Sequence, residues 1–192
     1  VFAMPADYVA EMVRQVIYDR YQEETYSKGI KVYTTIRQLD QEAAYQALRK
    51  NTIEYDRRRG YRGPEAHIDL LKHGTNQEKT LDDALDEVSD TDDIYAAIVL
   101  AAKPNTVQAY RKGGEIIEIK GDGLKFAQKF LTDKKETGKK YISPGALIRI
   151  QKDKKNNMWH IVQLPEIEAA LVSLNPNDGA IHALIGGFDF HK

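Results

Sequence analysis

Apolar residues recur every three or four positions near the start of this chain and every second position in its middle, which indicates helices followed by strands. Asp7 to Arg20 has the helical spacing, and Gln41 to Tyr55 repeats it among good helix formers. Between them, Ile30 to Ile36 is rich in β-branched and aromatic residues and is expected to form a strand. The chain therefore begins in the order helix, strand, helix.

A domain boundary is expected after the second helix. Arg57 to Gly63 is basic and contains glycine, and Pro64 then prevents the helical pattern from continuing. Further on, Glu78 to Asp93 holds eight acidic residues and one lysine, with apolar residues three or four positions apart. We expect a short helix with a solvated acidic face, and a docking surface is the alternative.

The middle of the chain is expected to form a small β-barrel. One helical segment, Gly123 to Leu131, interrupts five short strand-like runs separated by turn sequences. Five strands with one helix late in the series are compatible with a closed or partly open Greek-key barrel of the OB type. The five runs are Ile94 to Ala102, Thr106 to Tyr110, Glu115 to Ile119, Ala146 to Gln151 and Met158 to Gln163.

The last part of the chain predicts a hairpin that belongs to another sheet. Ala169 to Asn175 and Ala180 to Gly187 are apolar runs, and Pro176 to Gly179 joins them. The Asp-Gly pair in that turn supplies the positive φ that hairpin turns need.

Composition excludes several classes of function. The formal charge is −1, from 28 basic and 29 acidic residues, so no global field draws the chain to nucleic acid or to an acidic membrane. The absence of cysteine excludes disulfides and thiolate chemistry, and it is compatible with both cytoplasm and periplasm. No apolar run approaches the roughly 20 residues that span a bilayer, and no signal peptide opens the sequence. We expect a piece of a longer protein whose targeting and anchoring signals lie upstream.

Serine catalysis finds no support in the sequence. A penicillin-recognising serine enzyme needs a lysine three positions after its nucleophile. Ser173-Leu174-Asn175 matches the short Ser-x-Asn pattern, but it lies in an expected buried strand, and Lys135 to Gly138 misses Lys-Thr-Gly by an inserted glutamate. The serines Ser27, Ser89, Ser143 and Ser173 are followed three positions later by Ile30, Asp92, Ala146 and Pro176.

Metal and nucleotide sites are equally unsupported. Asp90 to Asp93 lacks the glycine and glutamate of a calcium loop, and Gly121-Asp122-Gly123 lacks a third glycine in phosphate-binding register. We therefore expect no catalytic, cofactor-binding or metal-binding residue in this chain. No compact ligand spacing joins the histidines His67, His73, His160, His182 and His191.

A basic tract is the remaining feature. Lys120 to Lys155 contains eleven basic and four acidic residues, clustered in Asp133 to Lys140 and Lys152 to Lys155, with aromatic residues nearby. Basic loops and exposed aromatics on an OB barrel bind single-stranded nucleic acid. We favour the simpler interpretation, in which lysines keep long hairpin loops soluble.

Several blocks in a fixed order carry a resemblance to a known family: Tyr8–Arg14, Gly29–Ile36, Gln41–Ala44, Tyr55–Pro64, Gln163–Pro165, Ala169–Pro176 and Gly179–Phe190. They resemble the bifunctional class A penicillin-binding proteins, particularly the 1A type of Gram-negative bacteria. The first block looks like the linker helix that leaves the glycosyltransferase domain, and the last blocks look like the first core strands of the transpeptidase. Arg37 departs from the aspartate that this family often has after Tyr-Thr-Thr-Ile.

The resemblance implies an α+β fold in which an OB-like module interrupts a transpeptidase domain. Residues 1–58 would be the linker helix and the first strand and helix of that domain, 59–163 the inserted module with its acidic helix, and 164–192 the first core strands. The nucleophile motif would lie beyond Lys192, so neither active site of the parent enzyme is expected here. The parent would polymerise and cross-link peptidoglycan at the periplasmic face of the inner membrane, anchored by an upstream transmembrane helix.

Three functions remain open for such a module. The resemblance favours a regulatory docking region for an outer-membrane lipoprotein activator, with no cofactor, no nucleic acid and no direct membrane contact. An independent OB-type binder of nucleic acid or oligosaccharide is the first alternative. An inert structural spacer is the second.

Overall fold

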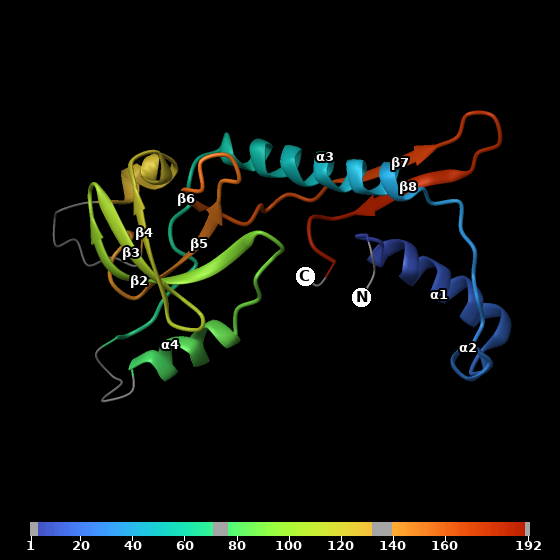
Figure 1. Ribbon diagram of the computed structural model, residues 1–192, viewed down its shortest axis with the longest axis horizontal. Coiled ribbons are helices and arrows are strands. Elements are labelled where there is room, and N and C mark those ends of the chain that lie inside the picture. The colour runs from blue at the N-terminus through green and yellow to red at the C-terminus, as the bar shows by residue number, and fades with distance from the viewer. Residues whose placement is uncertain (1–3, 71–76, 132–139, 191–192) are drawn as a thin grey trace. The chain divides into compact units, whose positions relative to one another are not determined.

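The computed structural model describes residues 4–70, 77–131 and 140–190, and it divides into two compact units (Figure 1). The terminal unit combines both ends of the sequence, Val1–Arg58 and Pro165–Lys192. The central unit is continuous and runs from Arg59 to Leu164. The two units are described separately below.

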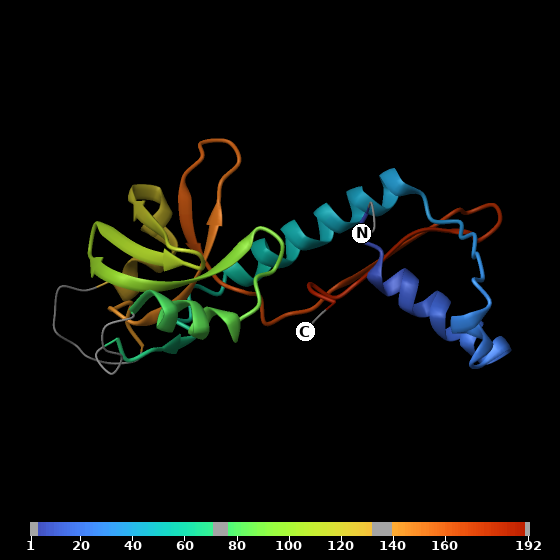
Figure 2. The ribbon, with the colours of Figure 1, turned by 60° about the horizontal axis from the view of Figure 1, so that its bottom comes forward.

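The terminal unit is a β-hairpin packed with helices. Strands β7 (Ala170–Leu174) and β8 (Ile181–Gly186) pair antiparallel, and Figure 2 shows them with α3 on one side and α1 on the other. Ala44 and Leu48 of α3 bury against Ala183 and Ile185 of β8, because these residues recur at helical and strand spacing on the facing surfaces. The helices of this unit are α1 (Asp7–Tyr21), α2 (Glu24–Ser27) and α3 (Gln38–Arg57).

On the edge of β8 that faces away from β7, backbone N–H and carbonyl groups form hydrogen bonds with side chains and with an extended segment. The side-chain amide of Gln41 accepts from the backbone N–H of Leu184 and donates to the backbone oxygen of the same residue, at 2.8 and 3.0 Å. Thr35 donates to the oxygen of Ile181, and the backbone N–H of Arg37 donates to that of His182. The strand expected over Ile30–Ile36 is therefore wrong: the segment is extended, but isolated bonds replace a ladder.

The central unit is built on one antiparallel sheet of six strands. The strand order is β1-β5-β2-β3-β4, and β6 pairs with β5 on the same edge as the short β1, opposite β2. The five short strands expected from alternating residues are confirmed to within about two residues at each end. The strands are β1 (Ala66–His67), β2 (Ile94–Lys103), β3 (Thr106–Arg111), β4 (Glu115–Lys120), β5 (Ala146–Lys152) and β6 (Trp159–Val162).

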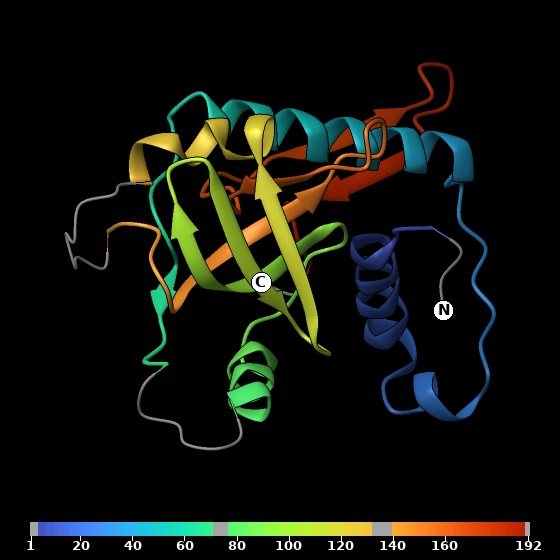
Figure 3. The ribbon, with the colours of Figure 1, turned by 60° about the vertical axis from the view of Figure 1, so that its left-hand side comes forward.

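The two faces of this sheet bury different partners. The inner face carries aliphatic residues such as Ala97, Val99 and Ile150, which pack on the 3₁₀ helix η1 (Gly121–Phe130). The outer face carries Ala96 and Ile98, which pack on α4 (Gln77–Asp86). Figure 3 shows α4, in green, and η1, in gold, on opposite sides of the sheet. Alternate residues of the strands thus serve two separate layers.

The sheet does not close into a barrel within the described residues. No ladder joins β4 to β6, although the two strands lie near each other, and η1 contacts both of them. Gly123 of η1 makes this possible, because a Cβ there would overlap the carbonyl oxygen of Trp159 and lie 2.8 Å from Cγ2 of Ile119. The expected mixed fold of helices and sheets is confirmed, and the central sheet takes the partly open form.

The chain enters and leaves the central unit at one place. The backbone N–H of Arg62 donates to the side-chain oxygen of Gln163 at 3.0 Å, and the guanidinium of Arg62 donates to the backbone oxygen of Leu164 at 2.6 Å. Gln163 in turn donates to the backbone oxygen of Gly60 at 3.1 Å. The two ends of the unit are therefore bonded to each other.

Candidate functional site

The acidic segment that stood out in the sequence folds as α4 and the turn behind it. The helix ends at Asp86, earlier than the run to Asp93 suggested, because the chain turns back through the backbone bonds between Thr91 and Ile94. Leu81 and Leu85 are buried against the outer face of the sheet. Their spacing of four residues leaves the carboxylates on the remaining faces of the helix.

Part of that acidic face binds the hairpin between β3 and β4. Asp82 accepts hydrogen bonds from the hydroxyl of Tyr110 at 2.9 Å and from the backbone N–H of Gly113 at 3.0 Å. Asp86 forms an ion pair with Lys112 of the same hairpin. These contacts were not expected, since a solvated face was the preferred interpretation. Asp83 and Glu87 remain exposed.

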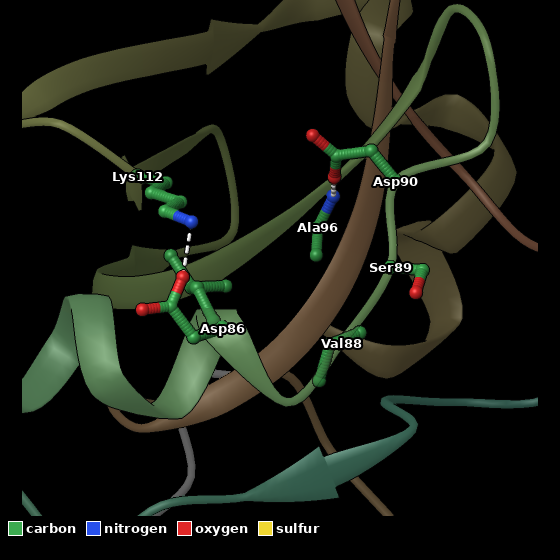
Figure 4. A pocket seen from close by; sticks show the side chains of 7 residues that line it. Asp86, Val88, Ser89, Asp90, Ala96 and Lys112 are labelled. Atoms are coloured by element: carbon green, nitrogen blue, oxygen red, sulfur yellow. Dashed lines mark hydrogen bonds and ion pairs between the residues drawn. The ribbon is translucent and has the colours of Figure 1, made fainter.

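A polar pocket of about 200 Å³ lies where α4 ends against β2 (Figure 4). Asp90 borders it and accepts a hydrogen bond from the backbone N–H of Ala96 at 2.8 Å, which fixes the loop after the helix. The floor is apolar and the rim carries carboxylates. The lining residues are Leu85, Asp86, Val88, Ser89, Asp90, Ala96 and Lys112.

Acidic side chains outnumber basic ones in the lining of this pocket. The hydrogen bond to Asp86, helped by the nearby carboxylates of Asp82 and Asp90, holds the pKa of Lys112 above its ordinary range. The lining holds two carboxylates, Asp86 and Asp90, against the one ammonium of Lys112, which pairs with Asp86. Such a surface attracts cationic groups.

A buried arginine supports the pocket from behind. Arg149 of β5 is 5% exposed and donates to the backbone oxygen of Ser89 at 2.7 Å. The same guanidinium forms two bonds to Glu65, just before β1. The pocket loop is therefore held by the sheet itself.

None of the four serines has the setting of a nucleophile. Ser143 comes closest, since its hydroxyl oxygen lies 3.2 Å from Nε2 of His67. That nitrogen also lies 3.2 Å from the backbone oxygen of Tyr141. A carbonyl only accepts, so Nε2 carries the proton in this contact and cannot serve as the base for Ser143. The pair ties β1 to the segment before β5.

The remaining serines occupy structural positions. Ser27 ends α2 and donates to the backbone oxygen of Glu24 at 3.5 Å, and Ser89 follows α4. Ser173 lies inside strand β7 as expected, but the burial expected for that strand is wrong, since its residues are exposed or only partly buried.

The residues that the structure describes contain no group of three acidic or histidine side chains placed to hold a metal ion. His160 lies in β6 and His182 in β8, while His73 and His191 fall outside the described residues. Nor does any described helix have the length and apolar character that crossing a bilayer requires.

The basic tract is dispersed where it is described. Lys120 pairs with Glu118 at 2.8 Å, and Lys125 pairs with Asp122 at 2.7 Å. Most of the Asp133–Lys140 cluster, together with the Lys135–Gly138 near-match to Lys-Thr-Gly, lies outside the described residues.

Comparisons with known proteins agree with this geometry. Residues 61–167 match the family described as the penicillin-binding protein OB-like domain. Penicillin-binding protein 1A of Neisseria cinerea is 40% identical over 186 residues, which are 96% of this chain and 23% of that protein. The Escherichia coli K12 protein of the same name is 34% identical over 195 residues, 99% of this chain and 23% of its own length.

A solved structure is similar over nearly the whole chain. The 2.6 Å crystal structure of penicillin-binding protein 1A from Haemophilus influenzae has a TM-score of 0.82 and 31% identity, and the match covers 99% of this chain and 27% of that one. The chain thus spans about a quarter of the length of the proteins it matches.

Proposed function

Because the chain belongs to the penicillin-binding protein OB-like domain family, we propose that it is a non-catalytic docking region of a peptidoglycan synthase. The resemblance to the 1A type, first seen in ordered sequence blocks, is confirmed by matches over 96% to 99% of the chain. The parent protein would carry glycan polymerisation and peptide cross-linking in domains outside this region. These activities and its location at the periplasmic face of the inner membrane belong to the proposal.

The division into functional regions is part of the same proposal. Residues 1–58 hold the linker helix and first elements of a transpeptidase domain, 59–163 the docking module, and 164–192 the first core strands of that transpeptidase. Supporting this division, the compact units change at Arg58 and Arg59 and again at Leu164 and Pro165.

The acidic pocket beside α4 is the observation that carries the docking role. It combines an apolar floor at Leu85 and Ala96 with exposed carboxylates on its rim. A lysine or arginine of a partner fits this arrangement, because the aliphatic stem can pack on the floor while the charged end meets Asp90. The partner surface is therefore basic.

An outer-membrane lipoprotein activator is the partner that we assign to this pocket. Binding beside α4 would change the activity of the parent only if the activator contacts its states differently. Nucleic acid is disfavoured because the pocket is acidic and phosphates would be repelled.

An amide NMR titration of the labelled chain with the soluble domain of that activator, from the same host, tests the docking role. We expect localised shift changes between Leu85 and Ala96 and at Lys112. Glu87 is exposed between the lining residues Asp86 and Val88, so Glu87→Lys places a positive charge beside the pocket. It should weaken binding by about tenfold, roughly the effect of replacing an attractive exposed pair by a repulsive one.

Glu54→Lys is the matched control, since it makes the same charge change on an exposed side chain of α3. It should leave the affinity unchanged. Unchanged spectra at saturating activator would instead support an inert spacer. Shift changes confined to the inner sheet face would show that the activator docks on a different surface.

A further inference from the structure

One end of the inner sheet face carries a row of large polar and aromatic side chains. The register places Lys152 of β5 directly opposite Trp159 of β6, and Arg111 of β3 directly opposite Glu115 of β4. Tyr95 of β2 lies between these pairs, because β2 is bonded to both β5 and β3. We call these five residues the end band.

The end band belongs to the same face as the buried core. Along each strand, side chains two positions apart share a face, so Tyr95 continues the row of Ala97, and Trp159 continues that of Ile161. Ala97 and Ile161 are fully buried, whereas Tyr95 and Trp159 are only partly covered. The core thus opens to solvent through aromatic residues.

Cations flank the two aromatic rings. The guanidinium carbon of Arg111 lies 3.9 Å from the centroid of the Tyr95 ring, and the ammonium of Lys152 lies 5.6 Å from that of Trp159. The rings meet edge to face, with centroids 5.9 Å apart. The contacts therefore run from Arg111 to Tyr95, from Tyr95 to Trp159 and from Trp159 to Lys152.

Hydrogen-bonding capacity remains on both cations. Arg111 has five N–H donors and uses one for its bond to Glu115, at 3.0 Å. Lys152 is exposed and has no ion-pair partner among the described residues. A ligand that lies across the rings would therefore meet an ammonium at one end and a guanidinium at the other.

We propose that the end band binds an oligosaccharide that carries carboxylates. Sugar rings would pack their C–H groups on the parts of the two aromatic rings that remain exposed, and the carboxylates would accept hydrogen bonds from Lys152 and Arg111. This site goes beyond the docking role, which uses the opposite face of the sheet. It rests on the proposed function only for the choice of peptidoglycan as the source of the glycan.

Charge favours this ligand over a nucleic acid. A single strand of nucleic acid needs a positive groove that follows every phosphate. The end band offers two cations and the carboxylate of Glu115, which suits a ligand with widely spaced negative groups and repels a dense polyanion. Neutral sugars alone would leave Lys152 without an anionic partner and the remaining N–H donors of Arg111 without a carboxylate.

Trp159 makes the test direct, because it is the one tryptophan of the sequence. The full chain is titrated with soluble, uncross-linked peptidoglycan strands that carry their stem peptides, and the emission of Trp159 is recorded. A saturable change is expected. Lys152→Gln and Arg111→Gln should each weaken binding about tenfold, the usual scale for a charge-assisted hydrogen bond.

Two controls decide between outcomes. Lys129→Gln removes one exposed positive charge from η1, outside the end band, and should leave binding unchanged. A chain of neutral N-acetylglucosamine rings should bind at least tenfold more weakly than the acidic strands. Equal affinity for both glycans, equal loss in all three variants, or no change in Trp159 emission would each overturn the proposal. None of these results would affect activator binding at the α4 pocket, so the two proposals fail separately.

Discussion

Arg149 and Glu65 form a two-pronged ion pair in which Nε and Nη2 of the guanidinium lie 2.9 Å from different oxygens of the carboxylate. The arginine side chain is 5% exposed and that of Glu65 is 36% exposed. The pair connects the start of β1 to the central strand β5, and the third arginine bond reaches Ser89. It thus couples the interior of the sheet to the pocket loop.

Removing the carboxylate charge should destabilise the central unit. Glu65→Gln leaves a buried guanidinium with one anionic partner fewer, and we expect a loss of about 2 kcal/mol, below the usual range for buried pairs because water reaches Glu65. Chemical denaturation measures the free energy, and hydrogen exchange should report faster opening near Ser89. Glu118→Gln, which removes an exposed ion pair with Lys120, should cost under about 0.5 kcal/mol. Equal losses would show that burial of Arg149 is unimportant.

The packing of η1 against β4 and β6 leaves no room for an added methyl group at Gly123, so the stability of the central unit should be sensitive to it. Gly123→Ala forces that methyl against the carbonyl of Trp159 and Cγ2 of Ile119, so we expect a loss of about 1–3 kcal/mol by overpacking. Lys129→Ala, on the exposed side of the same 3₁₀ helix, should stay within about 0.5 kcal/mol. Thermal unfolding of both variants measures the difference. If Gly123→Ala left the unfolding temperature unchanged, η1 would be able to move away from β4 and β6 at little cost in free energy.

The stability that the Glu11–Arg14 pair gives to helix α1 should depend on pH at values below the usual titration range of carboxylates. Two hydrogen bonds from Arg14, helped by Gln15, lower the pKa of Glu11 to about 2. The pKa of Glu11 in the folded protein lies below its unfolded value of about 4.3. The pair of Glu11 and Arg14 therefore contributes fully to folding stability above that value, and this contribution is lost as the pH falls toward 2.

Carboxyl carbon shifts in an NMR titration measure the midpoint for Glu11 directly. In Arg14→Gln the midpoint should rise toward about 4.3. A midpoint that is the same in both proteins would mean that Arg14 does not hold the carboxylate in solution.

The free edge of β7 should promote association between chains. The side chain of Gln41 bonds both the N–H and the carbonyl oxygen of Leu184, so these two backbone groups point away from β7. Val172 lies opposite Leu184 in the ladder, and its own N–H and carbonyl oxygen therefore point away from β8. Val172 is also 54% exposed, which leaves an apolar edge open to another strand. Sedimentation should therefore reveal concentration-dependent association.

Val172→Lys should shift that association toward monomer, because a lysine blunts an edge strand. Ile116→Lys provides the comparison, since Ile116 is 64% exposed on edge strand β4, where Glu118 and Lys120 already supply charge. It should leave association unchanged. A chain that is monomeric at every concentration would contradict the prediction.

A fluorescent β-lactam should not label this chain covalently. No serine has a lysine three positions later, and Nε2 of His67 is occupied as a donor beside Ser143. Gel fluorescence after incubation measures labelling, with a complete penicillin-binding protein as the positive control. Labelling of the chain, lost in Ser143→Ala, would refute the non-catalytic assignment.

Sequence patterns predicted the strands of the central unit because both faces of its sheet are covered and the register is fixed by burial. Tyr95, Ala97 and Val99 alternate with Ala96 and Ile98, and each set packs on its own helix. The strand expected at Ile30–Ile36 was wrong because β-branched composition does not supply a sheet partner. At Thr35 the bond to β8 is donated by the side-chain hydroxyl to the backbone oxygen of Ile181, so it is not part of a backbone ladder.

The candidate sites were visible only in part. The acidic segment was noticed, but its carboxylates were expected in solvent, since no local rule links Asp82 to Gly113 on a distant hairpin. The end band escaped notice for the same reason. Lys152 and Trp159 are close in sequence, but their relation to Tyr95 and Arg111 depends on strand order, which spacing alone does not reveal.

The bonds that join Arg62 to Gln163 and Leu164 make the central unit a removable part. Since the two ends of the central unit are held together, the unit takes the place of a short loop in the rest of the chain, whatever the number of residues it contains. A few flexible residues in place of 60–164 would span the same gap. Evolution can therefore exchange this module for another without rebuilding the protein that surrounds it.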